Sequence, residues 1–218
     1  MIVKVCGMRE PENIRAVEQL GIDMLGFIFW PGSPRYVGQM CTKAGSLAND
    51  LSENGRYEAK KAARVGVFVD DNPQNIVAHV QNCHLQYVQL HGSESPMIID
   101  SLRHLLTPGI RIIKALSIGS PADMERYKVY EGHVDMFLFD TKCQSVGGSG
   151  KQFDWSVLNA YDGAAPFLLS GGIGPDDAER VKGFRHSRLA GIDLNSRFET
   201  RPAVKDVSAL RRFLDEVR

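Results

Sequence analysis

The 218 residues of this chain are enough for a full hydrophobic core, and no linker-like stretch divides them into two compositions. We expect one domain over residues 1–218. The 26 Lys and Arg balance the 26 Asp and Glu, so the formal net charge is zero and no overall field attracts nucleic acid or an anionic membrane. No apolar stretch is long enough to span a bilayer. We predict a cytoplasmic protein that binds neither nucleic acid nor membranes and holds any anionic ligand by local groups.

The four cysteines, Cys6, Cys41, Cys83 and Cys143, are scattered, with no CxxC pair and no Cys/His cluster at zinc-finger spacing. Such spacing indicates neither a disulfide framework nor a structural metal. We therefore expect reduced thiols and no metal ion.

Short apolar runs alternate with turn signals and helical patterns along the whole chain, as in βα units. Eight such runs predict an α/β fold, a closed and compact (β/α)8 barrel in which some outer helices are short or missing because the chain is short for a barrel. The alternative is an open doubly wound sheet, but the alternation continues to the carboxyl terminus and favours the barrel. The predicted strands are Ile2 to Cys6, Met24 to Phe29, Arg64 to Val69, Gln86 to Leu90, Arg111 to Leu116, Val134 to Asp140, Pro166 to Ser170 and Leu189 to Asp193.

Proline marks several helix starts, at Pro11, Pro73 and Pro175, where its missing N–H costs no helical hydrogen bond. A last helix is predicted from Val204 to Val217, because apolar residues recur there at helical spacing and should pack on the sheet. The Gly- and Ser-rich run 141–151 is too long for a tight turn. Its place after the sixth strand predicts an active-site lid.

A cysteine closes the first strand. Alternation along that strand turns Lys4 and Cys6 toward the barrel axis and Val3 and Val5 toward the helices. A free cysteine has a pKa of about 8.5, and we hypothesise that Lys4 lowers it toward the neutral range. The alternative is that Cys6 is a small buried hydrophobic residue. Its position at the carboxyl end of a barrel strand favours the catalytic interpretation.

An aspartate closes the sixth strand. Asp140 is badly placed to cap the next helix because a long loop intervenes, and Asp154 takes that role more naturally. Since the carboxyl ends of all barrel strands open onto one face, Cys6 and Asp140 can act across one substrate. The sequence therefore predicts an acid and base pair.

Glycine-rich turns follow the last two strands, in Ser170-Gly171-Gly172-Ile173-Gly174-Pro175 and Asp193-Leu194-Asn195-Ser196. Glycines let backbone N–H groups approach a phosphate, and barrels commonly bind phosphate after strands seven and eight. A phosphorylated substrate is predicted. Arg35, after the second strand, is a candidate partner for a substrate carboxylate, with a solvated loop arginine as the alternative. His91 and Gln89, at the end of the fourth strand, are candidates to line the pocket, with a packed histidine as the alternative.

Together these segments resemble the phosphoribosylanthranilate isomerases of tryptophan biosynthesis over the whole chain. The motifs that carry the resemblance are Lys4-Val5-Cys6-Gly7, Gly32-Ser33-Pro34-Arg35, Gln89-Leu90-His91-Gly92, Phe139-Asp140, Gly147-Gly148-Ser149-Gly150-Lys151-Gln152-Phe153-Asp154-Trp155, Ser170-Gly171-Gly172-Ile173 and Asp193-Leu194-Asn195-Ser196. Each motif is weak alone, but in this order they are highly specific.

The resemblance implies an Amadori rearrangement by an intramolecular oxidoreductase that needs no cofactor. N-(5-phosphoribosyl)anthranilate would become 1-(2-carboxyphenylamino)-1-deoxyribulose 5-phosphate, with Asp140 as general acid at the furanose ring oxygen and Cys6 as general base at C2′. It implies Arg35 for the anthranilate carboxylate and a substrate contact for Asp193. It also places Gly171, Gly172, Asn195 and Ser196 near the phosphate. The expected partner is this phosphoribosyl substrate, and the chain is expected to be a monomer or homodimer.

Two positions depart from the pattern of that family. Ser149 stands where threonine is more usual and retains a hydroxyl group. Arg197 stands where glycine is expected, which argues against a close backbone contact with the phosphate at that position; the alternative is that the arginine side chain adds charge to the phosphate site. Three rivals stay open. They are the related histidine-pathway isomerase, which uses an aspartate in place of Cys6, a metal-dependent pentose-phosphate epimerase, and a phosphosugar-binding barrel without activity.

Overall fold

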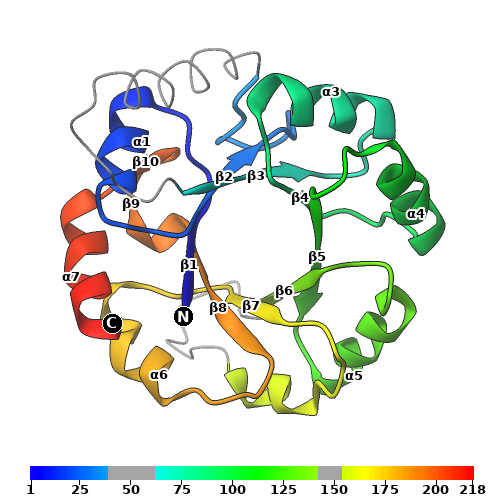
Figure 1. The fold of residues 1–218 in the computed structure, drawn as a ribbon. Coiled ribbons are helices and arrows are strands. Elements are labelled where there is room, and N and C mark those ends of the chain that lie inside the picture. The colour runs from blue at the N-terminus through cyan, green and yellow to red at the C-terminus, as the bar shows by residue number, and fades with distance from the viewer. Residues whose placement is uncertain (39–61, 142–153) are drawn as a thin grey trace.

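In a computed structural model that describes residues 1–38, 62–141 and 154–218, eight parallel strands close into a barrel surrounded by helices (Figure 1). The strands pair in chain order, and β1 closes the ring on β8. This confirms the predicted barrel and each of its strands to within two residues at either end. The strands are β1 Ile2–Val5, β2 Met24–Ile28, β3 Ala63–Phe68, β4 Tyr87–Leu90, β5 Arg111–Ile118, β6 Met136–Thr141, β7 Phe167–Ser170 and β8 Leu189–Leu194.

The outer layer combines α-helices with short 3-10 helices, which confirms that parts of it are reduced. The α-helices are α1 Pro11–Glu18, α3 Pro73–Cys83, α4 Pro96–Leu105, α5 Pro121–Met124, α6 Ala178–Gly183 and α7 Val207–Val217. The 3-10 helices are η1 Glu125–Tyr130, η2 Trp155–Ala160, η3 Pro175–Asp177 and η4 Ser196–Phe198. A hairpin of β9 Glu199–Arg201 and β10 Val204–Lys205 lies between β8 and α7.

Side-chain caps fix several of these helix starts. Asp154 caps η2 by accepting a hydrogen bond from the Ser156 N–H at 2.9 Å, which confirms its predicted role. The predicted start of the last helix at Val204 is wrong. Val204 belongs to β10, and Asp206 caps α7 by accepting from the Ala209 N–H at 2.9 Å.

The hydrophobic core has two parts. The larger part fills the space between strands and helices and includes Val3 and Val5, as predicted. The smaller part fills the barrel itself, with Met24, Val65, Ile113, Ala115, Met136, Leu138 and Leu168. Lys4 points inward and is fully buried. Polar side chains above the apolar plug therefore form the floor of the face where the strands end.

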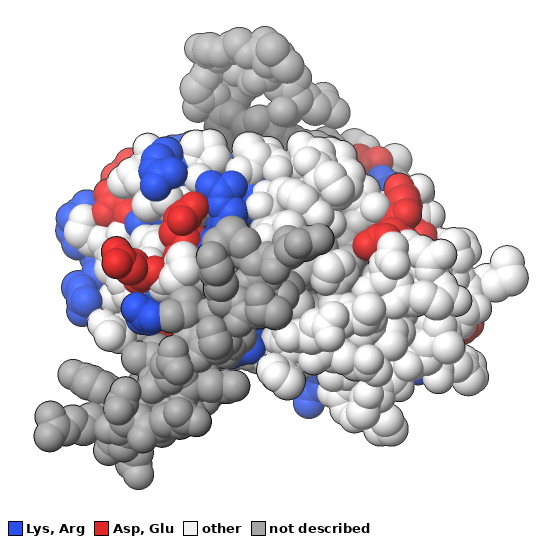
Figure 2. Space-filling view, turned by 90° about the horizontal axis from the view of Figure 1, so that it is seen from above, with Lys and Arg blue, Asp and Glu red and all other residues white. Residues whose placement is uncertain are grey.

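Three further predictions concern thiols, metal and surface charge. In the part of the chain that the structure describes, Cys6 is a free thiol but Cys83 is disulfide-bonded, so the expectation of reduced thiols is wrong at Cys83. Within the same ranges, no helix is long and apolar enough to cross a membrane and no cluster of His, Cys, Asp and Glu could hold a metal. Figure 2 shows both charge signs intermingled on one side of the face in view, over the side where Figure 1 places α1 and α7.

Candidate active site

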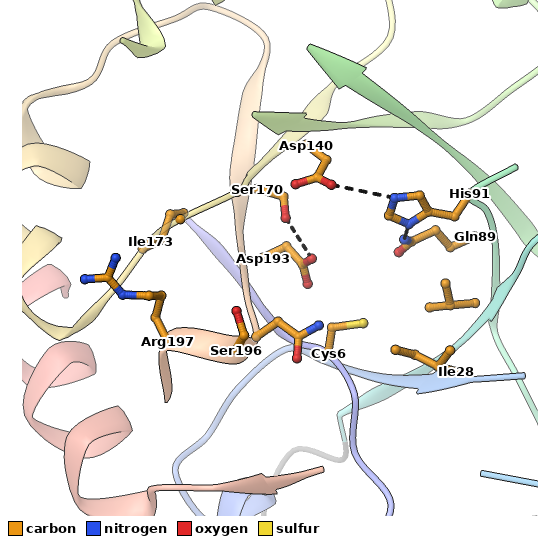
Figure 3. A pocket seen from close by; sticks show the side chains of 14 residues that line it. Cys6, Ile28, Gln89, His91, Asp140, Ser170, Ile173, Asp193, Ser196 and Arg197 are labelled. Atoms are coloured by element: carbon orange, nitrogen blue, oxygen red, sulfur yellow. Dashed lines mark hydrogen bonds and ion pairs between the residues drawn. The ribbon is translucent and has the colours of Figure 1, made fainter. Parts of the chain in front are cut away.

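A cavity of about 240 Å³ opens where the strands end (Figure 3). It brings together seven of the eight predicted site residues, with only Arg35 outside its lining. Figure 3 shows Cys6 and Asp140 on opposite sides of this space. The lining residues are Cys6, Ile28, Val67, Gln89, His91, Asp140, Ser170, Gly171, Gly172, Ile173, Asp193, Asn195, Ser196 and Arg197.

The position of Cys6 depends on a glycine in the neighbouring strand. The Cys6 N–H donates to the Leu194 carbonyl at 2.8 Å, which extends the pairing of β1 with β8 by one residue. On the other side, a Cβ at Gly26 of β2 would lie 2.7 Å from the Cys6 Sγ and 3.0 Å from its Cα. Gly26 therefore leaves the space that the thiol occupies.

A buried ion pair lies beneath the thiol. Lys4 Nζ donates to Asp193 Oδ1 at 2.8 Å, and Ser170 Oγ donates to Asp193 Oδ2 at 3.1 Å. Burial lowers the pKa of Lys4, but Asp193 and Cys6 outweigh burial and the net direction is upward. Lys4 thus stays a cation, and both carboxylate oxygens of Asp193 have protein partners.

The pKa of Cys6 moves against our hypothesis. Burial raises the pKa of the thiol, and this effect outweighs the lowering by the Lys4 ammonium. Lys4 lowers the pKa of Cys6, as predicted, but desolvation of the fully buried sulfur raises that pKa by more. In the protein alone Cys6 is therefore a protonated thiol at neutral pH.

The candidate acid belongs to a chain of polar side chains from β4 and β6. His91 Nε2 lies 3.8 Å from Asp140 Oδ2, and Gln89 Nε2 lies 3.0 Å from His91 Nδ1. With the amide donating to Nδ1, a neutral His91 carries its proton on Nε2, which faces Asp140. Gln89 Oε1 is buried and has no protein partner in the described part of the chain. It offers an acceptor to a substrate hydroxyl group.

The turn after β7 is shaped to hold an anion. Gly171 and Gly172 have positive φ angles of 96° and 68°, and a Cβ at Gly171 would lie 2.1 Å from the Thr141 carbonyl oxygen. A Cβ at Gly172 would meet no atom within 4 Å, so the space beside it is open. Among the described residues, the N–H groups of Gly172 and Ile173 have no protein acceptor. Such donors are suited to a phosphate.

The turn after β8 completes the same end of the cavity. Asn195 and Ser196 line it, and Asn195 Oδ1 accepts from Lys205 Nζ at 2.8 Å, which leaves the amide nitrogen as a donor. The Arg197 guanidinium packs on the β7 turn, where a Cβ at Gly174 would lie 3.1 Å from its Nε. Within the described ranges, no carboxylate forms a salt bridge with Arg197. Figure 3 shows Arg197 beside Ile173 and remote from His91.

Arg35 is not among the residues that line the cavity, and it pairs with Glu199, for which the sequence alone predicted no role. Arg35 Nε donates to Glu199 Oε1 at 2.8 Å, and its Nη2 donates to Oε2 at 2.6 Å. Lys205 Nζ also donates to Glu199 Oε1 at 2.6 Å. Burial raises the pKa of Glu199, but hydrogen bonds from both cations outweigh it and hold that pKa below its ordinary value. Glu199 is therefore a carboxylate between two cations.

Several predictions rest on residues outside the described ranges. The predicted lid is described only at its first residue, Thr141, and the departure at Ser149 also lies outside, as do Cys41 and Cys143. Glu199 and Lys205 carried no sequence signal, because one chain without relatives does not reveal which distant residues meet. The short spacing from Asn195 to Glu199 was the only pointer to a shared turn.

Comparison with known proteins identifies the family. The model of the N-(5′-phosphoribosyl)anthranilate (PRA) isomerase family matches residues 3–216. The N-(5′-phosphoribosyl)anthranilate isomerase of Phocaeicola vulgatus is 46% identical over 218 residues, covering 100% of this chain and 98% of that protein.

Two solved structures share the fold. One is a phosphoribosyl anthranilate isomerase in complex with reduced 1-(o-carboxyphenylamino)-1-deoxyribulose 5-phosphate, with a TM-score of 0.78, 28% identity and coverage of 100% and 98%. The other holds mutually generated monomers of the dimeric enzyme from Thermotoga maritima, with a TM-score of 0.76, 27% identity and the same coverage.

The contact between Gly26 and Cys6 predicts a local packing defect in Gly26→Ala. Its methyl group collides with the thiol, so we expect unfolding free energy to fall by about 1–3 kcal/mol and Cys6 to become more reactive. Urea titration and thiol labelling measure the two effects. Gly183→Ala is the matched control, because a Cβ there meets no atom within 4 Å. Equal stability of both variants would contradict the packing argument.

The raised pKa of Cys6 predicts slow alkylation. Only the thiolate reacts, so modification by iodoacetamide should be slow at pH 7 and still accelerating at pH 9, above the ordinary pKa of a cysteine. Mass spectrometry of the Cys6 peptide gives the rate at each pH. A rate that has already reached its plateau at pH 7 would mean that Lys4, not burial, dominates.

Proposed function

Because this chain belongs to the N-(5′-phosphoribosyl)anthranilate isomerase family, we propose that Cys6 and Asp140 are the base and the acid of its reaction. The enzyme is an intramolecular oxidoreductase that converts N-(5′-phosphoribosyl)anthranilate to 1-(o-carboxyphenylamino)-1-deoxyribulose 5-phosphate in tryptophan biosynthesis. The observation that carries the proposal is that both side chains face one cavity, Cys6 directly after β1 and Asp140 from β6, across a space bounded by β7 and β8.

Asp140 acts first in the proposed sequence. Its carboxylic acid protonates the furanose ring oxygen, the bond from C1′ to that oxygen breaks toward oxygen, and the nitrogen lone pair forms a protonated Schiff base. His91 Nε2 lies 3.8 Å from Asp140 Oδ2 and lines the same cavity. The exposed fraction of Asp140, 25%, leaves it accessible to the substrate.

Cys6 acts second, as the base that removes the proton from C2′. The electrons of that C–H bond form a double bond between C2′ and C1′, and the C=N electrons return to nitrogen, which gives an enolamine. Ketonisation of the enolamine then yields the product. The Schiff base cation next to C2′ and the Lys4 ammonium both favour the thiolate, which offsets the burial that raises the pKa of Cys6 in the protein alone.

The opposite end of the cavity is proposed to hold the phosphate. The N–H groups after Gly171, the amide of Asn195 and the Ser196 hydroxyl group are its donors in this proposal. The Arg197 guanidinium supplies the charge, since among the described side chains it forms no salt bridge and lines the same end. A charge-assisted pair with phosphate is the strongest contact available there. The reacting carbons then lie between Cys6 and Asp140.

The rivals are weaker for physical reasons. A metal-dependent epimerase needs a ligand cluster, and the described ranges contain none. A histidine-pathway isomerase would have a carboxylate where Cys6 stands. We propose that the reaction takes place in the cytoplasm and that the enzyme is a monomer or homodimer, the latter supported by the dimeric relative.

The acid and base assignment predicts the loss of turnover in Cys6→Ser and in Asp140→Asn. Each should lower kcat by at least about a hundredfold, because each removes one proton transfer. The decay of anthranilate fluorescence follows the reaction, and calorimetry with the reduced product analogue checks that binding persists. Near-normal kcat in either variant would overturn the role of that residue.

The phosphate assignment predicts a binding defect in Arg197→Ala. We expect KM and the inhibition constant of inorganic phosphate to rise by at least about tenfold while kcat changes little, since the lost contact is equal in ground and transition states. Arg201→Ala, an exposed arginine on β9, is the matched control. An unchanged inhibition constant of phosphate in Arg197→Ala would contradict the role of Arg197, and the phosphate would then be held by the backbone donors alone.

A further inference from the structure

Glu199 holds two cations that come from distant parts of the chain, and no step above uses it. We propose that Glu199 is a positioning residue that presents Arg35 to the anthranilate carboxylate and thereby sets the preference for a carboxylated aromatic amine. This inference rests on the proposed function and on our further assignment of Arg35 to the anthranilate carboxylate of the same substrate. Its support is the geometry of the cluster.

The contacts occupy only one edge of the guanidinium. Glu199 receives the bonds from Nε and Nη2 of Arg35, which form the side edge of the planar group. The end edge, formed by Nη1 and the second hydrogen of Nη2, has no acceptor among the described residues. An arginine can bind two carboxylates at once through these edges. Glu199 therefore fixes the plane of Arg35 and leaves an edge for the substrate.

The cluster also touches the catalytic strand. A Cβ at Gly7, which follows Cys6 with a φ of 76°, would lie 2.5 Å from Arg35 Cδ and 2.8 Å from Asn195 Oδ1. Gly7 is thus enclosed between Arg35 and Asn195. Since Lys205 bonds both Asn195 and Glu199, the bracing runs from the carboxylate-binding arginine to the phosphate turn. The cluster is placed beside the thiol, although it does not line the cavity.

The charges of the cluster suit an incoming carboxylate. Arg35 and Lys205 carry two positive charges and Glu199 one negative charge, so the net charge is positive by one. Glu199 is 5% exposed, Lys205 is fully buried, and Arg35 is 18% exposed, so only Arg35 is open to a ligand. A substrate carboxylate would bring this cluster to neutrality.

An alternative role for Glu199 predicts the opposite effect on the binding of the substrate carboxylate. If it competed with the substrate for Arg35, its removal would free the guanidinium and strengthen the binding of carboxylates. The free end edge argues against competition, because the substrate does not need the atoms that Glu199 occupies. The sign of the effect on binding therefore separates the two roles.

The test compares two ligands, the reduced product analogue and the same molecule without its ortho carboxyl group. In Glu199→Gln we expect the Kd of the carboxylated ligand to rise by at least about tenfold and that of the other to change less than about threefold. Calorimetry measures both. A structural role would weaken both ligands alike, and that result, or tighter binding of the carboxylated ligand, would overturn the proposal.

Control variants separate the proposed role of Glu199 from the general effect of removing a buried carboxylate. Glu94→Gln removes an equally buried carboxylate, paired with Lys114 at 2.8 Å, and should leave the ratio of the two Kd values unchanged. In an Arg35→Ala background, Glu199→Gln should have no further effect on that ratio. If the Glu199→Gln variant does not fold, Glu199→Asp takes its place. The ratio of the two Kd values should then change in the same direction but by a smaller factor. Turnover of phosphoribosylanthranilate by the unmodified enzyme tests the proposed function separately.

Discussion

The active site depends on the ion pair between Lys4 and Asp193, which joins the first strand to the last at the point where the barrel closes. These residues are direct register partners of β1 and β8 and lie in the polar layer above the apolar plug. Lys4 is fully buried and Asp193 is 7% exposed, at the floor of the cavity, so the carboxylate is the main partner of the buried cation. The pair therefore fixes the height of Cys6, two residues after Lys4, and places a cation beside the thiol that we propose as the base.

Glycines near this ion pair let neighbouring segments pack closely at both ends of the cavity. Gly26 makes room for the thiol, and Gly7 allows Arg35 and Asn195 to close on the segment after it. Gly171 lets the phosphate turn approach the carbonyl of Thr141, next to the candidate acid. At each contact a side chain would meet another atom at 2.8 Å or less. The distance between the proposed phosphate site and the proposed acid and base is thus set by backbone packing rather than by long flexible side chains.

Much of this arrangement could be predicted from the sequence. Each strand is a bounded apolar run, and parallel strands end on one face, so Cys6 and Asp140 had to converge. The predicted helix start at Val204 was wrong. Val204 and Lys205 lie beside apolar residues, and this pattern suits a short hairpin strand as well as the first turn of a helix. The pKa of Cys6 could not be predicted, since it is decided by burial in the folded protein. The partnership of Arg35 with Glu199 spans 164 positions and leaves no local pattern.

The central claim is that a thiol and a carboxyl group act on the same sugar from opposite sides. A crystal structure of this enzyme with the reduced product analogue tests it most directly. We expect the Cys6 sulfur to lie about 3 to 4 Å from C2′ and an Asp140 oxygen to lie within hydrogen-bond distance of the former ring oxygen, on the other side. A ligand bound in the cavity with C2′ out of reach of the sulfur, or with both groups directed at the same atom, would contradict the account.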